Sequence, residues 1–163
     1  TDFHPALVLI SRGPLVWSLA EAALKLTETT RQPVLYHHSE NFKHGPKAML
    51  SGSPLHTRPP CVLYLVPPDE REAEALFADV CQHFSEFVGT ADPQLRPKRL
   101  WMCFANGPEL PDDDWRAEPT FTLPAGESAI ERVLIALVGF HLLGLEVATA
   151  LGLDAQGLQK AVE

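Results

Sequence analysis

The sequence lacks the features that several protein classes need. Three cysteines in 163 residues, Cys61, Cys81 and Cys103, lie in widely spaced apolar runs. This predicts reduced, buried thiols in the cytoplasm rather than a disulfide framework.

Lys and Arg number 13 against 21 Asp and Glu, so a net charge of −8 argues against a nucleic-acid partner. The longest uncharged apolar stretch, 133–145, is too short to cross a bilayer, so we expect a buried core helix and no membrane association. No signal peptide is recognisable at residue 1.

Motifs for nucleotides and metals are also missing. Neither the dinucleotide fingerprint G-x-G-x-x-G nor the phosphate-binding G-x-x-x-x-G-K-[ST] occurs, so nucleotide binding is unsupported. His37 and His38 are adjacent, so on a strand they point to opposite faces and cannot bind one metal ion together. No C-x-x-C or H-x-x-x-H lies near them. We therefore expect neither a metal site nor a cofactor.

What the sequence does contain is an alternation of short apolar runs with longer amphipathic segments. This alternation predicts βαβ units, and hence a three-layer α/β/α sandwich with a mostly parallel sheet of about five strands. A length of 163 residues fits one domain, 1–163. The expected strands are 6–10, 33–36, 61–66, 100–105 and a weak edge strand at 120–123. The expected helices begin near Pro14, Pro68 and Ser128, with a short helical tail over 154–162.

Two further segments have specific expectations. The capping box Ser128-Ala129-Ile130-Glu131 should open the long helix that ends near Ala150. On that helix, His141 is expected to be a hydrogen-bonded core residue. The acidic loop 107–119 is expected to be a solvated surface excursion.

The first helix carries a row of charged side chains. Glu21, Lys25 and Glu28 are spaced by four and three residues, so they share one side of the helix beside its apolar stripe. An ordinary row of surface ion pairs has this spacing, and so does a carboxylate held next to a lysine for chemistry. The spacing alone leaves both interpretations open.

A second candidate lies after the second strand, in Asn41-Phe42-Lys43-His44-Gly45-Pro46. Gly45 permits a sharp turn and Pro46 can start a helix, so His44 would precede a helix N-terminus. The positive end of the helix dipole disfavours imidazolium, and a neutral imidazole can act as a general base. The alternative is a loop histidine that caps a turn.

Taken in order, these motifs resemble the sugar isomerase (SIS) family. Ser11-Arg12-Gly13-Pro14, residues 22–28 (AALKLTE) and 42–46 (FKHGP) are similar to the "GRGP", "EGALKLKE" and "KHGP" of the family's second SIS half, as found in glucosamine-6-phosphate synthase and its isomerase and deglycase relatives. The tail 158–162 (LQKAV) resembles the family's "NLAKSV". The likeness covers nearly the whole chain and implies the doubly wound SIS fold.

The resemblance also implies roles for individual residues. Glu28 matches the glutamate that moves a proton between C1 and C2 of a sugar phosphate, and Lys25 matches the lysine beside it. His44 matches the histidine that assists ring opening, reaching into a neighbouring subunit's site. Lys160 matches the tail lysine that closes over the sugar. The substrate-binding residues implied by the same resemblance are Ser11, Arg12, Gly13, Asn41 and Gly45.

The chain departs from the family pattern in three places. Asn41 stands where an acidic residue usually precedes the histidine, and Leu35 stands where a glutamate is common. The S-x-S-G-x-T loop that holds the sugar phosphate in the first SIS half does not occur. The expected partners are therefore a sugar phosphate and either a second copy of the chain or a first SIS half. The expected activity is aldose–ketose isomerisation of a hexose or amino-hexose 6-phosphate; a non-catalytic module that senses sugar phosphates or dimerises is the alternative.

Overall fold

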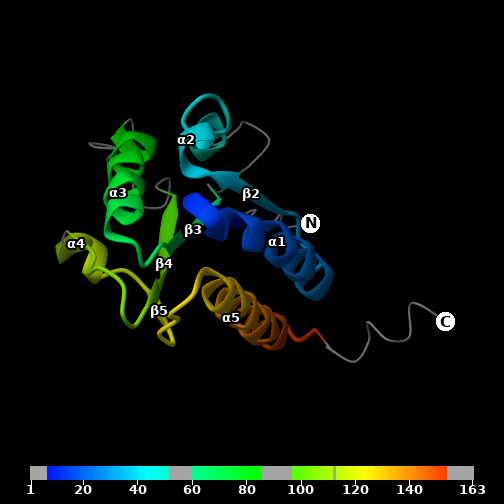
Figure 1. The fold of residues 1–163 in the computed structure, drawn as a ribbon. Coiled ribbons are helices and arrows are strands. Elements are labelled where there is room, and N and C mark those ends of the chain that lie inside the picture. The colour runs from blue at the N-terminus through cyan, green and yellow to red at the C-terminus, as the bar shows by residue number, and fades with distance from the viewer. Residues whose placement is uncertain (1–6, 52–59, 86–96, 112, 154–163) are drawn as a thin grey trace.

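Five parallel strands form one sheet in the order β2-β1-β3-β4-β5 (Figure 1). The computed structural model describes residues 7–51, 60–85, 97–111 and 113–153. All four strand pairings are parallel, with Leu7 opposite both Val34 and Cys61. The predicted fold class, a parallel five-stranded α/β sandwich, is confirmed. The strands are β1 (Leu7–Ser11), β2 (Val34–His38), β3 (Cys61–Val66), β4 (Lys98–Phe104) and β5 (Thr120–Leu123).

Helices cover both faces of the sheet (Figure 1). On one face, α1 and α5 pack together and share an apolar core with Leu9, Leu63 and Met102. On the other face, the short helix α2 and the longer α3 close a second core around Tyr64 and Trp101. The helices are α1 (Val16–Thr30), α2 (Ser39–Phe42), α3 (Glu70–Phe84), α4 (Asp113–Arg116) and α5 (Ala129–Ala150), with 3-10 turns η1 (Gly13–Leu15) and η2 (Pro46–Ser51).

Local sequence explains where these helices begin. η1 starts at Gly13 and Pro14, where a proline is tolerated because its missing N–H would have no helical partner. In α3, Asp69 is the N-cap and accepts a hydrogen bond from the Glu72 amide at 3.0 Å. The capping box predicted at Ser128 is present in both directions. Together these caps set the ends of the elements that frame the carboxyl edge of the sheet.

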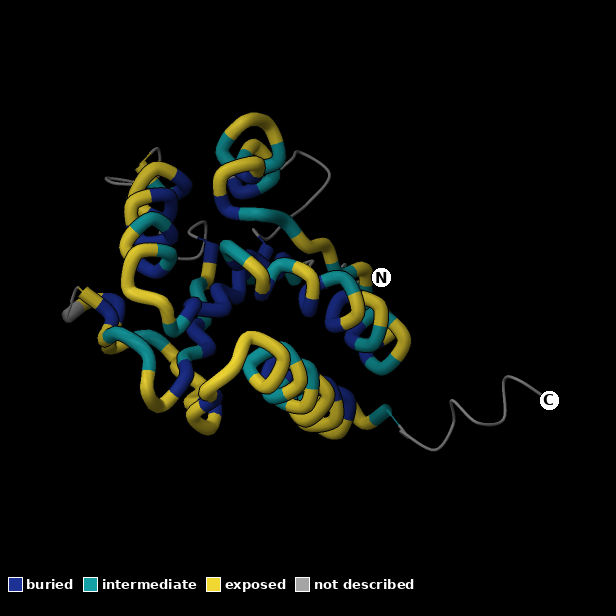
Figure 2. The backbone as a smooth tube through the Cα atoms, viewed as in Figure 1, coloured by how far each residue is buried: buried dark blue, intermediate teal, exposed yellow. Residues whose placement is uncertain are grey.

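The expectation of a fully buried helix is wrong for α5. Its inner face, with Ala136, Phe140 and Ala148, is buried, but its outer face is open to solvent (Figure 2). His141 lies on this open side, so it is exposed and not a core residue. By length and composition α5 could cross a membrane, with a mean hydropathy of 2.0 over 18 residues. A single such helix is weak evidence of a membrane span, because the core helix of a soluble protein passes the same test. The apolar residues of α5 extend around more of the helix than the side that packs on the sheet.

Two further expectations need correction. Cys81 is exposed, and Cys61 and Cys103 are only half-buried, so the three free thiols are not all core residues. The loop 107–119 is not simply a surface excursion, because it contains α4 and buries Leu110 and Trp115. The Trp115 ring stacks at 5.0 Å on the ring of Trp101 in β4. This loop therefore contains an aromatic anchor.

Candidate functional site

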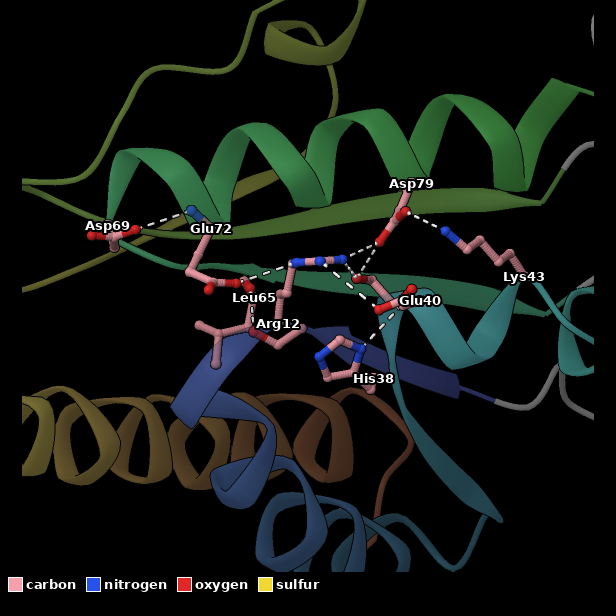
Figure 3. A network of polar contacts seen from close by, with 10 residues as sticks. Arg12, His38, Glu40, Lys43, Leu65, Asp69, Glu72 and Asp79 are labelled. Atoms are coloured by element: carbon pink, nitrogen blue, oxygen red, sulfur yellow. Dashed lines mark hydrogen bonds and ion pairs between the residues drawn. The ribbon is translucent and has the colours of Figure 1, made fainter.

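The strand order creates a crevice at the carboxyl end of the sheet. The chain leaves β1 for β2 on one side and then crosses to β3 on the other, so the ends of β1 and β3 form a topological switch point. Ligands of doubly wound sheets bind outside the carboxyl ends of the strands at such a point. Arg12 follows β1 directly and extends into this position (Figure 3).

Arg12 is the centre of an ion-pair network (Figure 3). Its Nη1 lies 2.8 Å from Asp79 Oδ2, and its Nε lies 3.2 Å from Glu72 Oε2, both on α3. Its Nη2 lies 3.9 Å from Glu40 Oε2 on α2. Three carboxylates therefore surround one guanidinium, and the side chain joins the end of β1 to two helices. In this arrangement the positive charge of Arg12 is already balanced.

Asp79 is the most buried member of this network, with its side chain 6% exposed. Besides Arg12, it accepts hydrogen bonds from Ser39 Oγ at 2.6 Å and from Lys43 Nζ at 3.2 Å. Burial on its own would raise the pKa of Asp79. The hydrogen bonds from Ser39 and Lys43 and the charges of Lys43 and Arg12 outweigh it and hold the pKa below its ordinary value. Asp79 is thus an anion that fastens both ends of α2 to α3.

A buried histidine reinforces the same contact between α2 and α3. His83 Nε2 lies 3.0 Å from the Ser39 carbonyl oxygen, and its Nδ1 lies 3.1 Å from the Tyr64 hydroxyl. Since a carbonyl only accepts, Nε2 carries the hydrogen and Nδ1 accepts from Tyr64. Burial lowers the pKa of His83, which keeps this ring neutral. The rings of His83 and Phe42 also meet edge to face, with their centroids 4.9 Å apart.

The other predicted residues near Arg12 have structural contacts. Ser11 is fully buried, and its hydroxyl donates to the Leu65 carbonyl oxygen of β3 at 2.7 Å. Gly13 has a φ of +62°, a backbone conformation that side chains other than glycine's rarely adopt. A Cβ at this position would lie 3.5 Å from Glu72, an ordinary van der Waals contact, so the positive φ and not a lack of space is what favours glycine here.

Lys25 and Glu28 meet on the outer side of α1. Lys25 Nζ lies 3.0 Å from Glu28 Oε2 and 4.0 Å from Glu21 Oε1. The hydrogen bond to Glu28 and its negative charge raise the pKa of Lys25, so the ammonium form persists above neutral pH. The Glu28 side chain is 47% exposed. Both interpretations of this row, a surface ion pair and an oriented carboxylate, are compatible with the geometry.

An open groove lies beside this row, between α1 and the edge strand β2. It has a volume of about 310 Å³, and α1 lines it with Leu24 and Thr27. From β2 come Leu35 and Tyr36, which are 42% and 45% exposed. The residues that line this groove include Thr27 but not Glu28.

His44 lies in the segment between α2 and η2. The side chain is exposed, and the His44 amide donates to the Asn41 carbonyl oxygen at 3.2 Å. The element that follows is a six-residue 3-10 helix starting at Pro46. Gly45 has no positive φ, and a Cβ there would meet nothing within 4 Å, so the turn does not require glycine.

Glu28 and His44 lie at opposite ends of the parallel strands. Glu28 is near the amino end of β2, and His44 comes after its carboxyl end. Thr27, beside Glu28, accepts a hydrogen bond from the amide of Val34, the first residue of β2. His44 follows the last residue of β2, His38, so a full strand separates the two positions along the sheet. A single chain therefore does not bring these groups together. Lys160, the predicted tail lysine, lies outside the described residues.

Sequence reasoning missed the buried polar residues Asp79 and His83. Their spacing from Leu76 and Val80 puts them on the apolar side of α3, where a polar side chain needs a partner. That spacing was the available signal. Among the described residues, no group of three or more His, Cys, Asp or Glu side chains is placed to hold a metal ion.

Comparison with solved structures gives the fold a context. The C-terminal domain of glucosamine-fructose-6-phosphate aminotransferase from Francisella tularensis matches 94% of the chain with a TM-score of 0.73 and 19% identity. Tagatose-6-phosphate ketose/aldose isomerase from Escherichia coli matches 93% with a TM-score of 0.67 and 18% identity. A protein of E. coli CFT073 solved in complex with A5P matches 99% with a TM-score of 0.64 and 11% identity.

The lengths of these proteins differ. The chain spans 38% and 37% of the first two matched chains but 79% of the third. No protein-family model and no curated protein sequence matches it. The matched structures are SIS-domain phosphosugar isomerases and their relatives, so the predicted resemblance is confirmed for the fold. Sequence identities below 20% carry it no further than the fold.

Proposed function

We propose that this chain is a sugar-phosphate-binding SIS unit that isomerises a hexose or amino-hexose 6-phosphate between its aldose and ketose forms. It would do so as the C-terminal unit of a phosphosugar isomerase or an amidotransferase-like enzyme, in the cytoplasm. The observation that carries the proposal is the fold shared, over 94% of the chain, with the C-terminal domain of an aminotransferase named for fructose 6-phosphate. The second match, a ketose/aldose isomerase, supports the same reaction class.

The Lys25–Glu28 pair supplies the chemistry that this reaction needs. Aldose–ketose interconversion requires a base that removes a proton next to a carbonyl and returns it to the neighbouring carbon. A cationic Lys25 at 3.0 Å orients the Glu28 carboxylate. In the proposal, Glu28 moves the proton, and His44 of a second unit assists ring opening.

In the proposal, this site needs a second unit. Glu28 is half exposed, whereas a general base works best when water is excluded from it. Arg12 is balanced by carboxylates and Ser11 is buried, so neither offers a free group for a phosphate. A neighbouring unit would therefore cover Glu28 and supply the phosphate contacts.

Proton exchange tests the role of Glu28 directly. Fructose 6-phosphate and glucosamine 6-phosphate are incubated in D₂O with the polypeptide that contains this chain, and loss of the C1 or C2 proton is followed by NMR. We expect Glu28→Gln to slow exchange by about 10²- to 10⁴-fold, equivalent to about 3–5 kcal/mol of barrier. The matched control is Glu21→Gln, because Glu21 also faces Lys25 and is equally exposed.

Three results would overturn the assignment. Unchanged exchange in Glu28→Gln removes the proposed base, and equal losses in Glu28→Gln and Glu21→Gln point to a general effect of charge on α1. Saturable binding of either sugar phosphate without any exchange in the wild type identifies a sensing module.

For His44→Ala, we expect a larger loss with a cyclic substrate than with an open-chain analogue.

A further inference from the structure

The helix α2 is too short to hold its own position. It spans four residues, Ser39–Phe42, and isolated helices shorter than about 12 residues are marginal in water. The His44 amide donates to the Asn41 carbonyl oxygen at 3.2 Å, so His44 follows wherever α2 is placed. Residues 39–44 are called the α2 segment below. Contacts with the rest of the protein must decide where this segment stands.

Two residues on α3 face the α2 segment. Asp79 and His83 are four residues apart, which places them on one side of the helix. Asp79 accepts from the Ser39 hydroxyl at 2.6 Å, and His83 Nε2 donates to the Ser39 carbonyl oxygen at 3.0 Å. At the other end of the segment, Lys43 Nζ lies 3.2 Å from Asp79 Oδ1 (Figure 3). The Phe42 ring packs against that of His83. The position of the segment is therefore set from α3.

The contacts of His83 suit a neutral ring. Its Nδ1 accepts from the Tyr64 hydroxyl at 3.1 Å, and the two residues are 1% and 0% exposed. Burial raises the pKa of Tyr64, so this hydroxyl keeps its hydrogen. A second proton on the ring would sit at Nδ1 and point at the Tyr64 oxygen, and the hydroxyl hydrogen would then lose its acceptor. Because a buried donor without an acceptor is unfavourable, protonation breaks a contact that the neutral ring satisfies.

The charges around His83 also oppose protonation. The ring faces Asp79 on its own helix, Lys43 at the end of the α2 segment and Lys47 in η2. The Asp79 carboxylate is already balanced by Arg12 and Lys43, so an imidazolium would gain little from it while facing two ammonium groups. Burial is the main reason that the pKa of His83 lies below its ordinary value, and the two lysines add to it.

We propose that His83 is a positioning residue whose neutral ring fixes the α2 segment against α3, and that its protonation in acid releases the segment. This placement does not depend on the proposed reaction. Its consequence for catalysis does rest on the proposed function. Where His44 assists ring opening, release of the segment removes that step, while Glu28 on α1 stays in place.

Amide hydrogen exchange followed by mass spectrometry, without any sugar, measures this release. The readout is the protection of peptides covering residues 39–47, corrected for the intrinsic effect of pH on exchange, between about pH 8 and pH 4.5. Because the pKa of His83 is lowered in the folded state, its contact is fully present above about 6.5 and is lost as the pH falls through the folded-state pKa. We expect protection of the α2 segment to fall by at least about tenfold in the wild type, while β3 keeps its protection.

Two variants assign the effect to His83. In His83→Gln, an amide that does not titrate keeps one donor and one acceptor, so protection should be independent of pH. In Tyr64→Phe, Nδ1 loses the hydrogen bond that favours the neutral ring, so release should begin at a higher pH than in the wild type. The second variant decides the question if His83→Gln fails to fold.

Two other histidines lie next to α2 and provide matched controls. His38 is the N-cap and accepts from the Glu40 amide at 3.2 Å, and the His37 ring lies 5.4 Å from that of Phe42 between centroids. His38→Asn keeps a good N-cap without a titrating ring, and His37→Gln removes the other ring. Both variants should release the segment at the same pH as the wild type.

Several outcomes would overturn the proposal. Protection that does not change with pH in the wild type, or that still falls in His83→Gln, removes the assigned role. A Tyr64→Phe variant that releases the segment at the wild-type pH or below it does the same. Loss of the pH dependence in His38→Asn or His37→Gln moves the role to that histidine, and an equal fall of protection in β3 shows global unfolding. Because no sugar is present, failure of the proposed isomerisation leaves these results unchanged.

Discussion

Removing the charge of Asp79 should destabilise the protein more than removing any of its more exposed neighbours. In Asp79→Asn, the side chain keeps its size, but its amide places a donor where Arg12, Ser39 and Lys43 already donate. Breaking one partner of a buried ion pair costs about 3–5 kcal/mol. The two cations are 22% and 23% exposed, and Arg12 keeps Glu72, so we expect a loss of about 2–4 kcal/mol.

The matched control is Glu72→Gln. Glu72 lies on the same helix and pairs with the same arginine at 3.2 Å, but its side chain is 39% exposed. Exposed pairs contribute about 1 kcal/mol or less. Urea unfolding followed by far-UV circular dichroism gives both free energies of unfolding at pH 7. A loss in Asp79→Asn no larger than that in Glu72→Gln would refute the view that burial makes Asp79 the key member of the network.

The pH dependence of the same measurement provides a second check. The pKa of Asp79 is lowered in the folded state, so its stabilising contribution is fully present above the ordinary aspartate value of about 3.9. It is lost as the pH falls through the folded-state pKa. The difference between wild type and Asp79→Asn should therefore shrink below about pH 4. A difference that stays constant down to pH 2 would show that the carboxylate charge is not its source.

Two further substitutions test local features. Trp115→Ala should lower the free energy of unfolding by about 3–5 kcal/mol, because this ring is 7% exposed and stacks on Trp101. A loss below about 1 kcal/mol in urea unfolding would show that Trp115 does not anchor α4 to the core. Gly13→Ala should cost about 1–2 kcal/mol, because φ is +62° there, whereas Gly45→Ala should be neutral or slightly stabilising. Equal thermal shifts in the two alanine variants would contradict this explanation.

Much of the fold could be predicted from local patterns. The five apolar runs became strands close to their expected bounds, and the capping box at Ser128 became the start of α5. These features depend on residues near one another in sequence, such as a cap and the amide three residues later. The parallel arrangement follows from the alternation of strands and helices, which requires crossovers.

The errors arose where burial depends on distant partners. Apolar periodicity shows that a face can be buried but not whether a sheet is wide enough to cover it, and α5 has apolar side chains on both its inner and outer sides. His141 was assigned to the core for the same reason. Trp115 was overlooked among acidic neighbours because its partner, Trp101, is 14 residues away in another element.

The candidate site shows the same limit more sharply. Residue types and order identified Lys25 and Glu28 as a pair, and the structure places them 3.0 Å apart because both lie on one helix. The role of Asp79, which holds both ends of α2, could not be found from residue types and order. Asp79 is 36 residues from Lys43 and 67 from Arg12, and only the packing of α3 against the ends of β1 and β2 brings the three together.

The separation of Glu28 from His44 follows from the topology of a βαβ unit. A helix that returns antiparallel to its strand ends at the amino edge of the sheet, and the next strand carries the chain back to the carboxyl edge before His44 occurs. Only 16 residues separate the two in sequence, yet β2 keeps them apart in every copy. If one sugar needs both groups, each cleft must take Glu28 from one unit and His44 from another. The reaction would then depend on the assembly of two units.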